Sequence, residues 1–499
     1  MSEGQIYVGT STKKEYLLLA LANRHGLIAG ATGTGKTVSL QILAEGFSKA
    51  GVPVFCADVK GDLAGISMKG VSKPFLEERA QKIGLEDYTY GASPAILWDL
   101  FGEQGHPIRA TIKDMGPLLL SRLMELNETQ EGVLTIAFRL AADQKLPLID
   151  LKDLRALIME VADKADQLTK EYGNVSKTSV GAIQRRLLVL EEQAAENFFG
   201  EPALDINDLM LKNSEGRGYV NVLAADKLMS NPRLYSTFLL WLLTRLFDKL
   251  PEVGDIEKPK LVFFFDEAHL LFTEAPKALL ERIEQVTRLI RSKGVGVYYI
   301  TQNPLDVPDT VSSQLGNRIQ HGLRAFTPKE QKAVKAAAET FRANPNLDTE
   351  KAILELSVGE ALVSLLEKKG QPSVVERTLI RPPASRLGPL TPDERKQLIA
   401  DSPVAGKYDE ESETESAYEK LKERKAGTAN GSATGDDGFE RHGEFRVPKP
   451  GDAQPTPKRP PAAPRSDSAG SAFTKSLLRS LGAAIPRILE RVLRGRIGR

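Results

Sequence analysis

Eight residues near the N-terminus, Gly30 to Thr37, constrain the fold of this chain more than any other stretch. They read Gly-Ala-Thr-Gly-Thr-Gly-Lys-Thr and match the pattern G-x-x-x-x-G-K-[ST] at every constrained position. A short apolar run, 25–29, comes before the loop, and residues 38–44 have helical spacing after it. A loop at such a strand-to-helix junction favours anions at the helix N-terminus. The sequence therefore predicts a phosphate-binding loop in an α/β fold.

The residue types of this loop predict the chemistry of a nucleotide site. Glycines let the backbone fold so tightly that successive N–H groups point at a phosphate. Lys36 would reach the β- and γ-phosphate oxygens, and the Thr37 hydroxyl would be a ligand of Mg²⁺. The residues predicted to hold the nucleotide are Gly30, Ala31, Thr32, Gly33, Thr34, Gly35, Lys36, Thr37 and Val38.

Two acidic residues after a second strand-like run supply the other half of the predicted site. Residues 261–265 are continuously apolar, as in a central parallel strand, and Asp266 and Glu267 follow them. We predict that Asp266 supports Mg²⁺, directly or through water, and that Glu267 orients and deprotonates the attacking water. Residues 296–301 form the next core strand, and Gln302 at its end is the predicted sensor of the γ-phosphate.

A cation in the following strand-like segment is the leading candidate for an arginine finger. Arg318 lies within residues 315–321, and Arg288 and Arg291 are weaker candidates. An arginine that reaches the γ-phosphate of a neighbouring subunit contributes roughly 10³–10⁵ to the rate. The alternative, that Arg318 is ordinary surface charge, stays open at the level of sequence.

The pattern along the chain predicts five segments. Residues 1–104 and 214–390 form the two parts of a nucleotide-binding core with a mainly parallel sheet. Residues 105–213, with apolar positions three and four apart, form an α-helical insertion between them. Residues 391–472 have the composition of a disordered, flexible linker. Residues 473–499 form a basic amphipathic tail that would bind DNA, an anionic membrane surface, a partner groove or its own ring.

Composition sets limits on the environment of the chain. The formal net charge of +1 carries no overall nucleic-acid signature, so any DNA contact must come from local patches. The single cysteine, Cys56, excludes a disulfide within one chain. The N-terminus lacks a basic segment followed by an apolar one, and the most apolar internal run, 238–243, is too short to cross a membrane. We expect a cytoplasmic protein without transmembrane segments.

Five motifs stand in a fixed order between residues 6 and 381. They are the P-loop, the strand ending at 58–62, Asp266-Glu267-Ala268-His269, the strand ending at Gln302, and Asn317-Arg318-Ile319. In this order they resemble the HerA/FtsK superfamily of hexameric ATPases, and most of all its HerA-like branch of bacterial YjgR-type proteins. The resemblance implies a RecA-like motor that assembles as a ring, with ATP between subunits and DNA as the polymer. HerA itself carries an N-terminal β-barrel that docks a nuclease; the P-loop here already begins at Gly30, so that partnership is not carried over.

Three other nucleotide-binding classes fit the sequence less well. Two-lobed helicases share the tetrapeptide at 266–269, but only about a hundred residues of folded pattern follow Gln302, too few for a second lobe. The LSGGQ signature of ABC ATPases is absent from the sequence. The N-K-x-D base motif of G proteins is also absent, so ATP is preferred over GTP by elimination.

These motifs together predict a Mg²⁺-dependent ATP hydrolase that couples hydrolysis to movement of duplex DNA. The DNA part of this prediction rests on the resemblance alone, because no base-reading module is visible in the core. The alternative is an ATP-dependent conformational switch or remodeller that acts on a protein partner through the helical insertion or the tail.

Overall fold

The described part of the chain is built on one large sheet. The computed structural model describes residues 4–431 apart from 193, 194, 274, 276 and 413. Its strands are β1 (Gln5–Thr10), β2 (Lys14–Leu18), β3 (Gly26–Ala29), β4 (Val54–Asp58), β5 (Ala95–Asp99), β6 (His106–Pro107), β7 (Val220–Ala224), β8 (Leu261–Phe265), β9 (Val295–Thr301), β10 (Asn317–Gln320), β11 (Glu360–Ser364) and β12 (Glu376–Ile380). Within the described residues they form a 12-stranded sheet in the order β2-β1-β12-β11-β10-β3-β9-β8-β4-β7-β5-β6.

The sheet is parallel over most of its width. Neighbouring strands from β10 through to β6 pair in parallel, whereas β2, β1, β12 and β11 pair antiparallel at one side. Every residue of β3, β4, β8 and β9 is buried, which explains why these strands read as continuous apolar runs. The predicted α/β fold with a mainly parallel sheet is confirmed.

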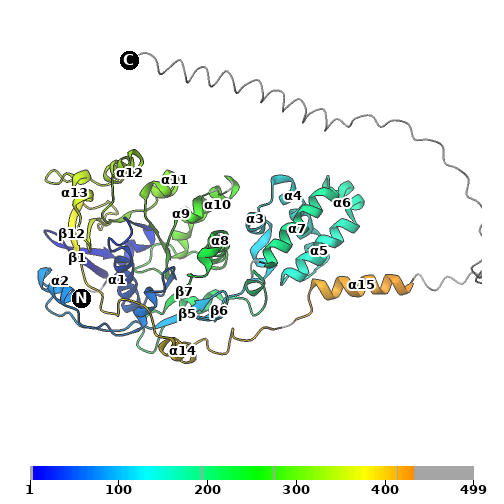
Figure 1. The fold of residues 1–499 in the computed structure, drawn as a ribbon, viewed down its shortest axis with the longest axis horizontal. Coiled ribbons are helices and arrows are strands. Elements are labelled where there is room, and N and C mark those ends of the chain that lie inside the picture. The colour runs from blue at the N-terminus through cyan, green and yellow to red at the C-terminus, as the bar shows by residue number, and fades with distance from the viewer. Residues whose placement is uncertain (1–3, 193–194, 274, 276, 413, 432–499) are drawn as a thin grey trace, which may run out of the picture. The chain divides into compact units, whose positions relative to one another are not determined.

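Helices cover both faces of the sheet (Figure 1). Alternate side chains of β8 show the two layers: Phe264 packs with Phe47 on one face, and Phe263 belongs to the same core cluster as Trp241 on the other. The helices are α1 (Lys36–Lys49), α2 (Pro74–Lys82), α3 (Ile112–Leu123), α4 (Glu128–Asp143), α5 (Leu151–Asp163), α6 (Ala165–Tyr172), α7 (Lys177–Glu192), α8 (Pro232–Lys249), α9 (His269–Phe272), α10 (Lys277–Leu289), α11 (Asp309–Ser312), α12 (Pro328–Glu339), α13 (Thr349–Glu355), α14 (Pro392–Ala400) and α15 (Ala417–Gly431).

Helices α3 to α7 lie between β6 and β7 in the sequence and form the helical region predicted there. Local signals start two of them: Asn127 and Asp150 each accept a hydrogen bond from the backbone N–H three residues on, and the residue at that position bonds back to the cap. Buried apolar residues three and four apart then pack these helices together. The boundaries of the insertion as a separate domain stay predictions.

The segment after residue 390 differs from the flexible linker predicted there. Residues 392–431 contain α14 and α15 and pack onto the core and the insertion. Tyr408 is fully buried, its ring 5.4 Å from that of Trp98, and its hydroxyl hydrogen-bonds Asp208. The backbone N–H of Tyr418 donates to Asp153 at 2.8 Å. The composition of residues 392–431 did not indicate this packing, because the buried apolar residues in the segment are single and separated by charged ones.

Two further predictions concern residues beyond those described. The rest of the predicted linker, 432–472, and the basic amphipathic tail, 473–499, lie outside the described residues.

Among the helices that the structure does describe, none has the length and the apolar character that a membrane crossing requires.

A buried histidine stands at the entrance to β3. His25 is 3% exposed and has a φ of +58°. Its Nδ1 accepts a hydrogen bond from the backbone N–H of Val297 at 3.0 Å, so Nδ1 carries no proton. Burial lowers the pKa of this imidazole to about 4. The folded protein therefore holds His25 neutral at pH values where an exposed histidine is charged.

We expect this histidine to weaken the fold in mild acid. Below the unfolded-state pKa of about 6.5 the unfolded chain binds the proton first, so the free energy of unfolding falls as the pH drops toward 4. At pH 5 this one histidine lowers the free energy of unfolding by about 2 kcal/mol. His25→Asn, which tolerates a positive φ and keeps an acceptor for Val297, should flatten the pH profile measured by urea unfolding between pH 7.5 and 5. An equally steep profile in the variant would contradict this account.

Candidate active site

The phosphate-binding loop lies between β3 and α1, as its flanking sequence predicts. The backbone N–H of Gly30 donates to Thr301 at 3.2 Å, and that of Ala31 donates to Gly322 at 2.9 Å, so two neighbouring strand ends hold the loop. Gly30 has a φ of +154°, and a Cβ there would lie 2.5 Å from Cβ of His321. Only glycine fits this position without displacing its neighbour.

His321 is buried behind the loop and supports it. Its Nδ1 donates to the carbonyl of Glu360 at 2.9 Å, which leaves Nε2 to accept from the Ser39 hydroxyl at 2.8 Å. Burial lowers the pKa of this imidazole to about 4, so the ring stays neutral beside the loop. The ring thereby connects the first turn of α1 to the start of β11.

Lys36, the first residue of α1, folds over the loop. Its ammonium group donates to the carbonyl oxygens of Gly30 at 2.6 Å and Ala31 at 3.2 Å. Burial lowers the pKa of this lysine, while the carboxylates of Glu267 and Asp266 act in the opposite direction. The lysine charge is therefore held close to the two acids that the sequence placed in the same site.

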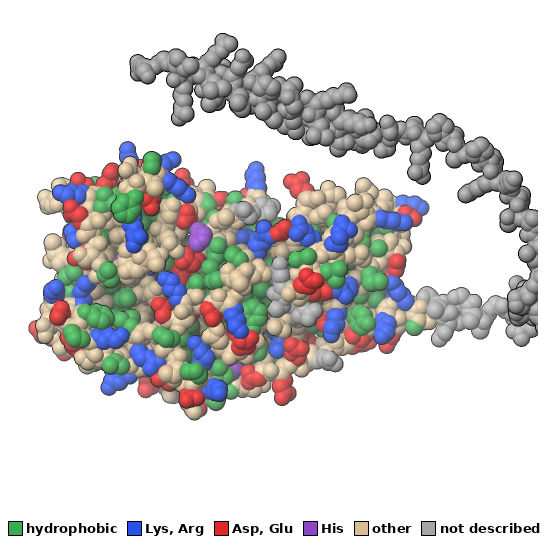
Figure 2. Space-filling model, in the orientation of Figure 1, with side chains coloured by type: hydrophobic (Ala, Val, Ile, Leu, Met, Phe, Trp, Pro, Cys, Tyr) green, Lys and Arg blue, Asp and Glu red, His purple; other side chains and the backbone are tan. Residues whose placement is uncertain are grey.

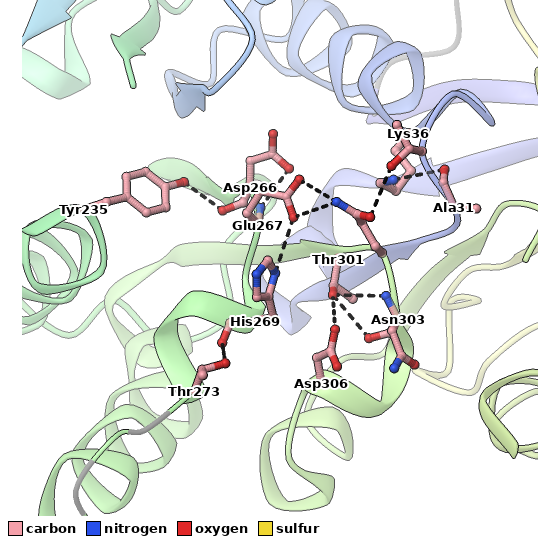
Figure 3. A network of polar contacts seen from close by, with 12 residues as sticks. Ala31, Lys36, Tyr235, Asp266, Glu267, His269, Thr273, Thr301, Asn303 and Asp306 are labelled. Carbon is pink, nitrogen blue, oxygen red and sulfur yellow. Dashed lines mark hydrogen bonds and ion pairs between the residues drawn. The ribbon is translucent and has the colours of Figure 1, made fainter. Parts of the chain in front are cut away.

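Asp266 and Glu267 follow β8 directly (Figure 3). The Tyr235 hydroxyl of α8 donates to the backbone carbonyl of Asp266 at 2.7 Å, and Asp266 Oδ1 accepts from the backbone N–H of Glu267 at 2.9 Å. Burial raises the pKa of the Asp266 carboxyl to about 7, and the charge of Glu267 adds to this effect. A nearby cation would therefore stabilise the ionised form of the Asp266 carboxyl group.

Glu267 is fixed by two side chains and an unusual backbone. Its φ is +48°, a left-handed conformation that costs energy in a non-glycine residue and is found at functional sites. Gln302 Nε2 donates to Glu267 Oε1 at 3.1 Å, and His269 Nδ1 lies 3.3 Å from Oε2 (Figure 3). The hydrogen bond from His269 holds the pKa of Glu267 below its usual range. The Glu267 carboxylate is therefore ionised, and its two side-chain partners fix its orientation.

Gln302 connects the two halves of the site. The Thr32 hydroxyl in the loop donates to Gln302 Oε1 at 3.1 Å, and Gln302 donates onward to Glu267. The strand order explains this, because β9, which ends before Gln302, lies between β3 and β8. A chain of two hydrogen bonds therefore runs from the phosphate-binding loop to the acid.

Arg318 occupies a different environment from the other predicted site residues. It is half-buried on β10, and its guanidinium donates to the Ser312 carbonyl at 2.8 Å and to the Ser312 hydroxyl at 3.3 Å. To act as an arginine finger, Arg318 would have to leave these contacts. The arginine-finger role of Arg318 stays a prediction.

Three supporting residues were given no role in the sequence analysis. His269 had a usable signal, since it stands two positions after Glu267. Tyr235 and His321 had none, because each reaches the site from a distant part of the chain.

The oxygen donors present suit a magnesium ion that shares its shell with a nucleotide. Mg²⁺ is usually held by one or two protein oxygens together with phosphates and water. Within the part of the chain that the structure describes, no group of three or more His, Cys, Asp or Glu residues is arranged to hold a metal. The Thr37 hydroxyl makes no hydrogen bond to any described residue, and Asp266 adds a carboxylate. These two residues fit the predicted ligand set.

Comparison with known proteins gives distant relatives over most of the chain. A probable helicase of Methanocaldococcus jannaschii is 24% identical over 377 residues, covering 72% of this chain and 67% of that protein. The DNA double-strand break repair helicase HerA of Saccharolobus solfataricus is 21% identical over 370 residues, covering 72% and 66%. The chain thus spans about two thirds of the length of these relatives.

Solved structures that align with the chain include a plasmid coupling protein and VirB4. The plasmid coupling protein TrwB in complex with a non-hydrolysable ATP analogue is 18% identical, covers 78% of this chain and 93% of that chain, and gives a TM-score of 0.46. VirB4 of Thermoanaerobacter pseudethanolicus is 14% identical, covers 79% and 99%, and gives a TM-score of 0.48.

One protein family accounts for the whole chain. The sequence model described as "Helicase HerA-like C-terminal" matches residues 3–499. The match agrees with the motif order and with the mainly parallel sheet. The chain belongs to the Helicase HerA-like C-terminal family and is a P-loop ATPase of the HerA/FtsK type.

Proposed function

We propose that this protein is a Mg²⁺-dependent ATP hydrolase that couples hydrolysis to movement of duplex DNA. The observation that carries the catalytic part is the hydrogen-bonded chain from Thr32 through Gln302 to Glu267. It joins the loop that would hold the phosphates to the carboxylate that would accept a proton from water. Hydrolysis requires both parts in one site, a loop that holds the phosphates and a carboxylate that accepts a proton.

Each residue of the site has a defined task in this proposal. The loop amides and Lys36 bind the β- and γ-phosphates and stabilise their charge. Mg²⁺, held by Thr37 and Asp266, would neutralise charge on the phosphate oxygens when bound. Glu267 Oε orients the attacking water and takes its proton, and His269 keeps that carboxylate ionised. Gln302 fixes the direction of the carboxylate.

The same hydrogen bonds offer a route by which nucleotide state reaches the acid. Thr32 lies in the loop, so a change at the γ-phosphate alters its hydroxyl and hence the contact with Gln302 Oε1. Gln302 transmits that change to Glu267 because one amide group holds both partners. The amide thereby acts as the γ-phosphate sensor.

DNA as the polymer is supported by the relatives and not by the surface charge. The Saccharolobus relative is named a DNA double-strand break repair helicase. Figure 2 shows Lys and Arg side chains interspersed with Asp and Glu on the face drawn, without a broad basic area. A DNA contact on that face would therefore be local. Assembly as a ring, a hexamer as the resemblance implies, would place a neighbour's arginine, with Arg318 the candidate, at the γ-phosphate.

The proposal is tested by the ATP turnover of the full chain with and without linear duplex DNA, with oligomeric mass recorded in parallel. DNA-stimulated turnover together with a ring-sized mass is the expected result. Glu267→Gln serves as the reference that binds nucleotide and DNA without hydrolysis. Turnover that is indifferent to DNA would reject the translocase and favour the alternative, an ATP-dependent switch that acts on a protein partner.

A further inference from the structure

A pocket lies apart from the phosphate-binding loop, between the helical insertion and the core. It has a volume of about 690 Å³ and is lined by the end of α3, the residues after it, α7, the start of α8 and α9. A neighbouring hollow of about 400 Å³ shares Glu125, Arg186 and Val189 with it. Segments from four separate parts of the sequence therefore enclose one space.

Positive charge is concentrated around this space. Arg122, Arg186 and Arg233 line the pocket, and Glu125 is the one acidic residue among the described residues that line it. Arg186 Nη1 lies 2.9 Å from Glu125 Oε2, and Arg233 is paired with Oε1 of the same carboxylate. One carboxylate thus pairs with two of the three guanidinium groups that line the pocket.

Arg122 is the charge that this arrangement leaves without a counter-ion. It donates to the carbonyl oxygens of Leu270 at 3.2 Å and Leu271 at 3.3 Å and to the Ser236 hydroxyl at 3.0 Å, and it forms no ion pair with any described residue. Burial lowers the pKa of this guanidinium to about 10, and the nearby charge of Arg233 adds to the effect. A charge in such surroundings gains strongly from an anion.

Two neutral groups reinforce the preference for an anion. Ser121 is 2% exposed, lines the pocket, and its hydroxyl oxygen has no hydrogen-bond partner among the described residues. The pocket also includes Asn231 and Pro232 at the N-terminus of α8, an 18-residue helix whose positive end points here. Buried hydroxyl groups normally have a partner, so an oxygen-rich ligand accounts for this one.

We propose that this pocket binds a phosphate group, supplied either by a nucleic-acid backbone or by a free polyphosphate. A phosphate has enough oxygens to accept from several guanidinium groups at once, whereas a carboxylate has two. The volume exceeds what one phosphate needs, so the pocket accommodates neighbouring groups of the same chain. The site is distinct from the P-loop and stands whether or not ATP hydrolysis drives DNA movement.

The pocket is also connected to the candidate active site. Arg122 holds the carbonyl oxygens of Leu270 and Leu271 on α9, the helix that starts at His269 beside Glu267. A phosphate that binds Arg122 competes with those carbonyls. A phosphate in the pocket would therefore shift α9 and, with it, the contact of His269 with Glu267. In this way a bound polyanion would influence turnover.

The test measures binding of a fluorescent 30-nucleotide duplex to the full chain without nucleotide, by anisotropy. Arg186→Gln should weaken binding about tenfold, because it removes a charge-assisted contact. Glu125→Gln should strengthen binding several-fold, because it removes the internal competitor for two arginines. Arg139→Gln, which takes one exposed arginine from α4 on the same insertion, is the matched control and should bind like wild type.

Val189→Glu provides a second probe that breaks no ion pair. Val189 is 44% exposed on the pocket wall, so the variant keeps its fold and should weaken binding. The source of the phosphate follows from a parallel titration with inorganic tripolyphosphate in the Lys36→Ala background, where the P-loop is disabled. Pocket variants that alter duplex binding support a nucleic-acid backbone, and variants that alter tripolyphosphate binding alone support a free polyphosphate.

The opposite signs of the two variants separate a binding site from a structural cluster. If Glu125→Gln and Arg186→Gln both weaken binding, the ion pairs serve to hold the fold and the proposal is wrong. If all pocket variants match Arg139→Gln with both probes, the pocket binds no phosphate. Neither result depends on ATP turnover, so failure here is distinguishable from failure of the proposed function.

Discussion

Replacing Glu267 with glutamine is expected to lower the turnover number for ATP by roughly 10²–10⁴-fold while nucleotide binding persists. The amide keeps the size of the carboxylate and still accepts a hydrogen bond from Gln302, but it cannot take a proton from water. The contacts that hold the phosphates, at Lys36 and the loop, are untouched. The loss should therefore appear in the chemical step and not in affinity.

Two measurements check this expectation. Steady-state hydrolysis gives the turnover number, and titration with a fluorescent ATP analogue gives the dissociation constant. Glu281→Gln is the matched control, since it makes the same change at an exposed position on α10 and should hydrolyse ATP like wild type. A Glu267→Gln enzyme with near-normal turnover would remove Glu267 from the role of general base.

Replacing Lys36 with alanine is expected to lower kcat/KM by roughly 10²–10⁴-fold, mainly through lost nucleotide binding. A hydrogen bond to a charged group contributes about 1.5–3 kcal/mol, and Lys36 would make such bonds to two phosphate oxygens. The variant also frees the Gly30 and Ala31 carbonyl groups, which the ammonium group now contacts. The pattern is opposite to that of Glu267→Gln, because affinity falls together with turnover.

Lys49→Ala is the control for charge and helix. Lys49 is exposed at the other end of α1, so its removal changes the net charge by the same amount without touching the loop. Isothermal titration with ATP and Mg²⁺ on both variants separates the two effects. Unaltered binding by Lys36→Ala would mean that the loop does not hold phosphates.

Much of the architecture could be predicted because its signals are local. The strand, loop and helix around residues 25–44 are contiguous in the sequence. Burial on both faces makes β8 a continuous apolar run, which is visible in the sequence. The prediction failed for residues 392–431, where composition indicated a linker. There a few buried anchors such as Tyr408 and Leu421 are enough to hold a polar segment in place.

The sequence by itself determined the fold class, the order of the motifs and the identity of the residues at the ends of β3, β8 and β9, since each depends on a few adjacent positions. Only the tertiary structure decided which of these side chains meet. The Thr32 to Gln302 hydrogen bond joins residues 270 positions apart, and it exists because β9 lies between β3 and β8. The arginine pocket likewise collects residues 122, 186 and 233 from three helices or their flanks. Long-range contacts of this kind follow from packing and leave no periodic signal in the chain.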